Sequence, residues 1–433
     1  MIDFLFLYEH KVREIDNLCL ICAELEKRGY STVIEYANNC PLFKYKYFNK
    51  PKVVVHFCLY SSNGLENVAA IVGKYRKLVN LQWEQVTTNT KSDIAFVTPK
   101  GEAKYATHIC WGETVVNRLQ ENGIKNAILT GAVQLDFLKG NLINYYKSKE
   151  ELLKNYSICS KKIITYISSF GLTELKEQEI AKIVQRSGKD SLTRIEHSLR
   201  EREIILSWLI EVLEHNQECC VIYRPHPYES LDSRILDIER NYPQFRIIGT
   251  ESVKQWILVS DLILTTRSTT ITEVFYAKKP CIILRPLDNT NDEELPIYDN
   301  AAVCNSIQQL NDMIDADYND FPVPENNFIP YYGKPDSQYA YLNISDLLEK
   351  VINSTAYDIF HKPGKLARKR RMKNFAKKLI VMLGITEETW PFSKIEKVRK
   401  WLSFFKYYRE KQSLDYCSKE EINRIKTHIK YLI

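Results

Sequence analysis

The chain has 433 residues, of which 45% are hydrophobic and 26% are charged. This length allows two or three domains with sizeable cores, and the composition excludes collagen-like, disordered and low-complexity proteins. No apolar run approaches the ~18 residues of a membrane span, and the first residues carry no basic leader, so we expect the protein to stay in the cytosol.

Eleven cysteines are scattered through the chain, mostly inside apolar stretches. An odd number in such positions indicates reduced core thiols rather than a disulfide framework. Cys19 and Cys22 have CxxC spacing, but they fall inside a helical pattern and no second pair accompanies them. This context argues against a metal or redox site.

The net charge of +6 is distributed unevenly. Residues 356–433 hold 20 Lys and Arg against 8 Asp and Glu, whereas residues 1–355 hold 40 against 46. An acidic body with a basic C-terminal segment indicates that the two parts meet different partners.

Strands and helices alternate in the first third of the chain. The apolar patterns predict strands at Ile2–Leu7, Ser31–Glu35, Lys52–Phe57, Lys77–Leu81, Thr107–Trp111 and Ala127–Thr130, and helices at Val12–Lys27, Gly64–Arg76 and Glu113–Gln120. Such alternation is typical of a parallel sheet in a Rossmann-like domain.

A second alternating series begins after the polar, Lys-rich stretch at residues 141–161. The patterns predict strands at Lys162–Ser168, Cys219–Tyr223, Phe245–Ile248, Leu262–Thr265 and Cys281–Leu284, and helices at Leu192–Glu214, Leu231–Arg240, Val253–Leu258 and Thr269–Ala277. A further helix at Leu342–Ile352 either closes this second domain or crosses back onto the first.

These patterns predict an α/β fold with two Rossmann-like domains that face each other across a cleft, which is the GT-B architecture. We expect an N-terminal domain over residues 1–145, a second domain over 160–355 and a basic, amphipathic helical tail over 356–433.

In open α/β sheets, ligands bind beyond the carboxyl ends of the strands. Arg224-Pro-His-Pro227 follows a predicted strand, and its two prolines stiffen the turn. A guanidinium offers a fixed fork for phosphate oxygens, and an imidazole can donate to a departing phosphate as negative charge develops there. We interpret Arg224 and His226 as phosphate ligands, with a purely structural turn as the alternative.

Ser260 to Glu273 has the pattern of an apolar strand, a polar turn and the start of a helix. Free N–H groups at that helix start, together with the hydroxyls of Ser268 and Thr269, would bind an anion. Glu273 would accept hydrogen bonds from ribose hydroxyls, although an acid at this place would also complement the helix dipole.

The segments Arg224–Pro227 and Ser260–Glu273 resemble the nucleotide-binding half of bacterial surface-polysaccharide transferases, namely the CDP-glycerol glycerophosphotransferases of teichoic acid synthesis and the capsule-type Kdo transferases. Phe6–Glu14, Leu81–Gln85 and Thr130–Asp136 resemble the group described as surface carbohydrate biosynthesis proteins. The resemblance covers about residues 1–355.

This resemblance implies a nucleotide-activated donor. Arg224 and His226 would face its phosphates, Ser268 and Thr269 would hold them, and Glu273 would meet the ribose. After Gly131 the chain lacks the proline and the basic residue that glycerophosphotransferases usually have, which disfavours a polyol-phosphate donor.

Further candidates follow other predicted strands. Glu9 and His10 follow the first strand and Glu84 the fourth, where a carboxylate could act as general base on an acceptor hydroxyl and His10 could orient that hydroxyl or replace the carboxylate. Ser168 and Ser169 offer hydroxyls and amides for a phosphate or sugar. The candidate catalytic residues are therefore Glu84, Glu9, His10 and His226, and each of the first three has an ordinary surface residue as its alternative.

No metal or other cofactor is predicted. Asp315-Ala-Asp317 has the DxD spelling of metal-dependent transferases, but it follows a helix instead of a strand, which is typical of a solvated acidic loop. Arg, His and a helix terminus can offset the phosphate charge without a divalent ion.

The basic tail alternates cations with apolar and aromatic residues over residues 361–409. This pattern is typical of an interfacial helix on an anionic membrane. The alternatives are a tail helix packed on the body and a nucleic-acid-binding arm, but no RNP, KH or zinc-finger pattern accompanies the cations. We predict a peripheral protein on the cytoplasmic face of the cell membrane, with no nucleic-acid partner.

Taken together, the patterns predict a metal-independent glycosyltransferase that moves a sugar from a CMP-, CDP- or UDP-linked donor to a surface polysaccharide, such as capsule or O-antigen, or to a lipid-linked glycan. The alternatives are a glycerol- or ribitol-phosphate transferase of teichoic-acid type, a UDP-sugar 2-epimerase, and a non-catalytic scaffold of a polysaccharide assembly complex.

Overall fold

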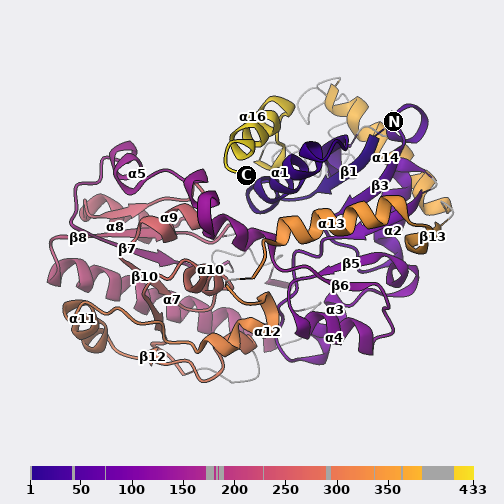
Figure 1. Ribbon diagram of the computed structural model, residues 1–433. Coiled ribbons are helices and arrows are strands. Elements are labelled where there is room, and N and C mark those ends of the chain that lie inside the picture. The colour runs from indigo at the N-terminus through magenta and orange to yellow at the C-terminus, as the bar shows by residue number, and fades with distance from the viewer. Residues whose placement is uncertain are drawn as a thin grey trace, which may run out of the picture. The chain divides into compact units, whose positions relative to one another are not determined.

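The computed structural model describes residues 2–40, 44–73, 75–171, 180–181, 184, 190–227, 229–288, 294–335, 337–361, 364–382 and 414–433. The chain forms two compact units, which are shown in Figure 1. The first comprises Met1–Thr87, Lys91–Tyr145 and Ile329–Ile433, and the second comprises Thr88–Thr90 and Tyr146–Phe328.

The sheet of the first unit has seven strands within the described residues. They are β1 (Ile2–Tyr8), β2 (Thr32–Tyr36), β3 (Pro51–His56), β4 (Tyr75–Asn80), β5 (Thr107–Cys110), β6 (Ala127–Leu129) and β13 (Asp358–His361). The first six are parallel in the order β2-β1-β3-β4-β5-β6, and β13 pairs antiparallel with β4. The order reverses between β1 and β3, and this switch point is where open α/β sheets bind ligands.

The helices of the first unit come from both ends of the chain. Within the described residues they are α1 (Lys11–Lys27), α2 (Ser62–Val72), α3 (Lys91–Val97), α4 (Glu113–Glu121), α12 (Ile329–Tyr332), α13 (Ala340–Asn353), α14 (Lys365–Met382) and α16 (Lys419–Lys430). Both α13 and α16 pack against α1, and α14 packs against α2. The predicted helix at Gly64–Arg76 ends earlier than expected, because Gly73 adopts a φ of 74° and β4 begins two residues later.

The second unit ends at Phe328 and not near the expected residue 355. The reason is that α13 crosses back to α1. Arg28, which follows α1, pairs with Asp346 and Glu349 of α13, both at 2.6 Å. The segment from Ile329 onward therefore completes the first unit.

The second unit has a sheet of six parallel strands within the described residues. The strands are β7 (Lys162–Ile167), β8 (Cys219–Arg224), β9 (Phe245–Ile247), β10 (Leu262–Thr265), β11 (Cys281–Leu284) and β12 (Val303–Cys304), and the helices are α5 (Lys149–Asn155), α7 (Asp190–His215), α8 (Ser233–Asn241), α9 (Val253–Val259), α10 (Ile271–Tyr276) and α11 (Ile307–Asp315). The order β12-β11-β10-β7-β8-β9 is that of the Rossmann fold, with its switch point between β7 and β10. The predicted α/β fold class is confirmed.

The described parts of the C-terminal extension pack on the first unit. Lys426 and Lys430 of α16 both pair with Glu26 of α1 at 2.7 Å. On α14, Arg370 donates to Asn67 of α2 at 2.6 Å. Of the predicted membrane segment, residues 362–363 and 383–409 lie outside the described residues. None of the described helices is long and apolar enough to cross a membrane.

Candidate functional site

The switch point of the second sheet brings together loops from three neighbouring strands. Ser168 and Ser169 follow β7, and the hydroxyl of Ser169 is hydrogen-bonded to that of Thr266, which follows β10. The backbone N–H of Ser168 donates to the carbonyl of Arg224 at the end of β8, at 3.0 Å. The predicted residues Ser168 and Ser169 thus lie at the edge where this fold binds ligands.

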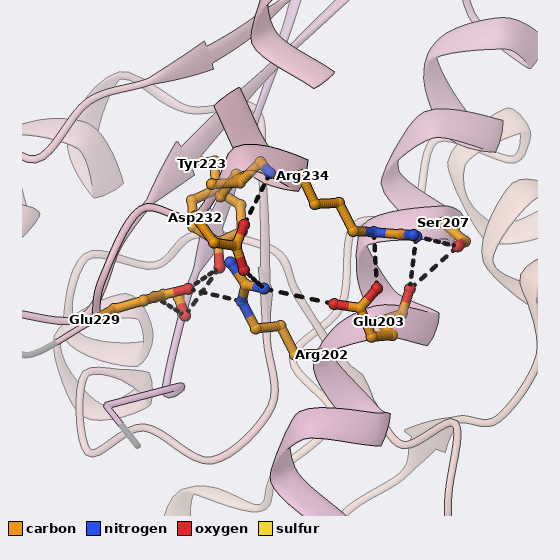
Figure 2. A network of polar contacts seen from close by, with 9 residues as sticks. Arg202, Glu203, Ser207, Tyr223, Glu229, Asp232 and Arg234 are labelled. Atoms are coloured by element: carbon orange, nitrogen blue, oxygen red, sulfur yellow. Dashed lines mark hydrogen bonds and ion pairs between the residues drawn. The ribbon is translucent and has the colours of Figure 1, made fainter. Parts of the chain in front are cut away.

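A buried acid holds the turn that follows β8 (Figure 2). The side chain of Glu229 is fully buried, and its carboxylate accepts hydrogen bonds from the hydroxyls of Ser168 and Tyr223, both at 2.5 Å. The carboxylate also accepts the backbone N–H of His226 at 3.0 Å and pairs with Arg202 of α7 at 3.2 Å. Two loops and a helix are therefore fixed by one side chain.

Arg202 links Glu229 to two further acids, Asp232 and Glu203, as Figure 2 shows. This residue is 2% exposed and pairs with Asp232 at 2.6 Å. Although burial opposes its charge, pairing with Asp232 raises the pKa of Arg202. Asp232 also caps α8 by accepting the backbone N–H of Ile235 at 3.0 Å. The start of α8 is thereby joined to the turn that holds His226.

His226 lies close to the loop that follows β7. A Cβ atom added at Gly171 would stand 2.6 Å from His226 Nδ1, so only glycine permits this approach. Burial lowers the pKa of His226 below its usual value. The imidazole is therefore neutral near pH 7, with one nitrogen as donor and the other as acceptor.

Arg224 is 9% exposed, and its guanidinium donates to backbone carbonyls. The acceptors are Ile248 at 3.3 Å, Thr250 at 2.6 Å and Glu251 at 2.7 Å. Burial lowers the pKa of Arg224 to about 10. The guanidinium is thus directed at the loop after β9, and its contact with a phosphate stays a prediction.

The helix after β10 begins two residues later than expected, at Ile271. The backbone N–H of Ser268 donates to the hydroxyl of Tyr298 at 2.9 Å, and the Ser268 hydroxyl accepts the N–H of Thr270 at 3.3 Å. These bonds stabilise a turn in place of a first helical turn. Ser268 and Thr269 therefore lie in the turn directly before Thr270, the N-cap residue of α10, and their contact with a phosphate stays a prediction.

Glu273 lies in the first turn of α10 and is partly exposed. Burial raises its pKa above the ordinary value for a glutamate. The contact of Glu273 with a ribose stays a prediction.

The switch point of the first sheet holds the other candidates. Glu14 of α1 is fully buried, and its carboxylate accepts the backbone N–H groups of Glu9 at 3.1 Å and His10 at 3.3 Å. Arg13 donates to Glu14 at 3.0 Å and to Glu84 at 3.1 Å. This chain of contacts links the backbone of Glu9 and His10, which follow β1, to the side chain of Glu84, which follows β4.

Burial and exposure distinguish Glu14 from Glu84 in this cluster. Burial raises the pKa of Glu14 to about 7, although Arg13 opposes the shift. The side chain of Glu84 is 55% exposed. Glu84 is therefore accessible to solvent, whereas Glu14 is buried and holds the backbone N–H groups of Glu9 and His10.

The loop after β4 is strained. Gln82 is fully buried and has a φ of 52°, in the left-handed region that favours glycine. Its side chain donates to the carbonyl of Val97 at 3.3 Å, and Tyr60 donates to the carbonyl of Glu84 at 3.2 Å. Backbone strain of this kind occurs at functional sites, where the surroundings hold it in place.

Asp136, in the motif that begins at Thr130, has a structural role. Its carboxylate accepts the backbone N–H groups of Ala340 at 3.0 Å and Tyr341 at 2.8 Å, which begin α13, and burial raises its pKa to about 7.

A pocket of about 340 Å³ lies near this motif. Its lining includes Trp111, Thr130, Gly131, Asn343, Asp346 and Lys350, and it contains none of the predicted site residues.

The two acids of the DxD-like motif, Asp315 and Asp317, each contact a basic side chain. Asp315 bonds to His215 at 2.8 Å, and Asp317 bonds to Lys162 at 2.8 Å. Among the described residues, no three His, Cys, Asp or Glu side chains are grouped so that they could hold a metal ion. All eleven cysteines lie within the described residues, and none of them forms a disulfide. Metal independence stays a prediction.

Glu14, Glu229 and Arg202 were not predicted from the sequence. Each is a charged residue with a buried side chain that holds neighbouring loops, and a single sequence does not show which charged residues are buried. A weak signal was present, because Glu14 follows His10 by four residues and Glu229 follows His226 by three. Acids so close to a candidate turn can reach back to its backbone N–H groups.

No protein-family model matches this chain, and no curated protein sequence matches it. Solved structures do resemble it. The UDP-GlcNAc 2-epimerase from Methanocaldococcus jannaschii has a TM-score of 0.52 and 15% identity, over 80% of this chain and 99% of that chain. The UDP-GlcNAc 2-epimerase from Neisseria meningitidis, bound to UDP-GlcNAc, has a TM-score of 0.50 and 14% identity, over 81% of this chain and 100% of that chain.

A third similar structure is the wall teichoic acid polymerase TagF. It has a TM-score of 0.51 and 14% identity, over 81% of this chain and 89% of that chain. Identities of this size show the fold alone, since one fold can carry many chemistries. The chain therefore has the α/β fold of GT-B proteins, with two parallel-sheet Rossmann-like units and a helical C-terminal region.

Proposed function

We propose that this protein is a GT-B-type glycosyltransferase that moves a sugar from a CMP-, CDP- or UDP-linked donor to a surface polysaccharide or a lipid-linked glycan. The observation that supports it is the switch point of the second sheet, where Ser169, Thr266 and His226 come from three neighbouring strands. Proteins of the same fold include one bound to UDP-GlcNAc and a wall teichoic acid polymerase.

On the donor side, the hydroxyls of Ser168, Ser169, Ser268 and Thr269 would hold the phosphates, and Glu273 would accept the ribose hydroxyls. Because burial lowers the pKa of His226, its neutral ring donates one N–H to the leaving phosphate oxygen as charge develops there. Arg224 would hold the adjacent loop while its buried positive charge offsets the phosphates. This scheme uses no metal ion.

On the acceptor side, Glu84, Glu9 and His10 are the candidate bases. The base takes the proton of the acceptor hydroxyl while its oxygen bonds to the anomeric carbon and the bond to the leaving phosphate breaks. Glu84 is the most exposed carboxylate of the cluster, and Arg13 holds it. Arg13 and Glu14 fix the geometry of the cluster.

The first test is thermal unfolding of the purified protein with CMP, CDP, UDP and GDP. A nucleotide at 100 times its dissociation constant adds about 2.7 kcal/mol to the free energy of unfolding. We expect a shift with one pyrimidine nucleotide, reduced in His226→Gln and Ser268→Ala and retained in Ser230→Ala, an exposed serine of the same unit. No shift with any of the four would contradict the proposal.

A second test separates the enzyme alternatives by their products. A glycosyltransferase releases the nucleotide and leaves the sugar on an acceptor. A UDP-sugar 2-epimerase changes the sugar of the free donor without an acceptor, and a polyol-phosphate transferase releases CMP from CDP-glycerol. If His226→Gln still supports glycan synthesis in cells, a non-catalytic scaffold is the better account.

We also propose that the C-terminal extension attaches the protein to an anionic membrane. The support is α14, which exposes Met372 by 69% and Phe375 by 48% among exposed Arg368 and Lys369. We expect sedimentation with phosphatidylglycerol vesicles but not with phosphatidylcholine vesicles, and release as salt rises. The Met372→Asp variant should bind less. Equal binding to both vesicle types would contradict this proposal.

A further inference from the structure

His10 lies beside an acid from the far end of the chain. The Asp415 carboxylate is 3.6 Å from His10 Nδ1, within ion-pair distance, and accepts the backbone N–H of Lys11 at 3.4 Å. The His10 side chain is 28% exposed and that of Asp415 is 15% exposed. Partial burial reduces the screening of such a pair by solvent.

The position of Asp415 is fixed by its neighbours in the extension. The backbone N–H of Cys417 donates to the buried hydroxyl of Tyr8, the last residue of β1, at 2.8 Å. Glu421 of α16 pairs with Lys11 at 2.8 Å. Ile422 and Ile429 are buried on α16, which packs against α1. Residues 414–433 are therefore anchored at the carboxyl end of β1, where His10 lies.

We propose that this C-terminal segment completes the acceptor site and that Asp415 is a positioning residue for His10. The proposal rests on the proposed function, and it deepens that function by choosing His10 as the base. The carboxylate attracts the proton of Nδ1, so the Nδ1–H tautomer dominates and the Nε2 lone pair is left free.

The tautomer decides what the ring can do. Nε2 accepts the proton of the acceptor hydroxyl while that oxygen bonds to the anomeric carbon and the leaving phosphate takes the electrons of the broken bond. The proton stays on the ring, and the Asp415 carboxylate balances the imidazolium charge. Without the carboxylate, the ring would divide between its two tautomers and a fraction would present an N–H to the acceptor.

The test is ¹⁵N NMR of histidine-labelled full-length protein, with the His10 signals assigned by their loss in His10→Gln. We expect the Nδ1–H tautomer in the wild type, loss of that preference in Asp415→Asn, and its recovery in Asp415→Glu. The matched control is Glu420→Gln, at an exposed acid of α16 that is not among the residues that anchor the segment. The proposal is overturned if the wild type shows the Nε2–H tautomer, or if Asp415→Asn leaves the ratio unchanged.

Kinetics distinguish this inference from the proposed function. With the donor nucleotide sugar that the protein binds, Asp415→Asn should lower kcat by at least about 10-fold with KM for the donor unchanged, and His10→Gln should lower it by about 10²-fold. Turnover in the wild type with no loss in either variant would overturn the role of the pair. Absence of turnover in the wild type would count against the proposed function, whereas the NMR result would still decide the tautomer.

Discussion

The carboxylate of Glu229 accepts the backbone N–H of His226 at 3.0 Å, inside a network that also holds the buried guanidinium of Arg202. Because the acid lies only three residues after the histidine, the turn between them closes on itself, with the N–H of Glu229 donating back to the carbonyl of His226 at 2.8 Å. A buried ion pair thus holds the backbone of a candidate catalytic histidine.

Replacing Glu229 by Ala should lower the free energy of unfolding by about 1 to 3 kcal/mol, because the donors of Ser168, Tyr223 and His226 would lose their buried acceptor, whereas Arg202 would still pair with Asp232. Urea unfolding measures this change. The matched control is Glu203→Ala, since Glu203 contacts the same arginine at 3.5 Å but is 47% exposed. An exposed pair contributes at most about 1 kcal/mol. Equal losses in the two variants would contradict the role given to Glu229.

Gly171 provides a test of the packing around His226. The Gly171→Ala variant places a Cβ atom 2.6 Å from His226 Nδ1, so the ring must move. We expect a smaller thermal shift with the nucleotide that binds the wild type. Gly249→Ala is the control, because its Cβ would stand 3.5 Å from Pro225, an ordinary contact. Unchanged binding in Gly171→Ala would mean that His226 does not face the nucleotide.

Much of the fold was predictable because strands buried on both faces are continuous apolar runs. The strands at Leu262–Thr265 and Cys281–Leu284 were predicted to the residue. The start of α10 was not predicted to the residue. The backbone N–H of Ser268 donates to the hydroxyl of Tyr298, which lies thirty residues further along the chain. Propensity describes local preference, and a distant partner can override it.

The sites were predictable only in outline. Polar residues after strands indicate an edge of the sheet, so Glu9, His10 and Glu84 could be named before any contact was known. Arg224 has the residue type of a phosphate ligand, yet its guanidinium meets the carbonyls of Thr250 and Glu251. The direction of a side chain depends on the loop it meets, which the sequence does not specify.

Glu14 should make stability depend on pH. Burial raises its pKa from 4.5 to about 7, so the folded state binds a proton more tightly than the unfolded state. Its contribution to the free energy of unfolding is therefore fully present below about pH 4.5 and falls as pH rises to about 7, by up to about 3 kcal/mol.

Urea unfolding at several pH values between 4.5 and 8 measures this contribution as the difference between wild type and Glu14→Gln. We expect the stability of the wild type relative to the variant to decrease with rising pH and to level off above pH 7. Glu121→Gln, at an exposed residue of α4, should show no such slope. A difference that rises with pH would mean that Arg13 dominates and that Glu14 is charged throughout.

Glu66 of α2 should stabilise the start of α14. Its carboxylate accepts the backbone N–H groups of Gly364 at 3.2 Å and Ala367 at 2.7 Å, at the start of α14. These donors have no partner within their own helix, so removing the acceptor in Glu66→Ala should cost about 0.5 to 2 kcal/mol. Hydrogen exchange at residues 364–368 should become up to about 30-fold faster. Glu66→Gln keeps one acceptor oxygen and should lose less. If exchange does not change in either variant, α14 is held by its arginine contacts to α2 and not by its cap.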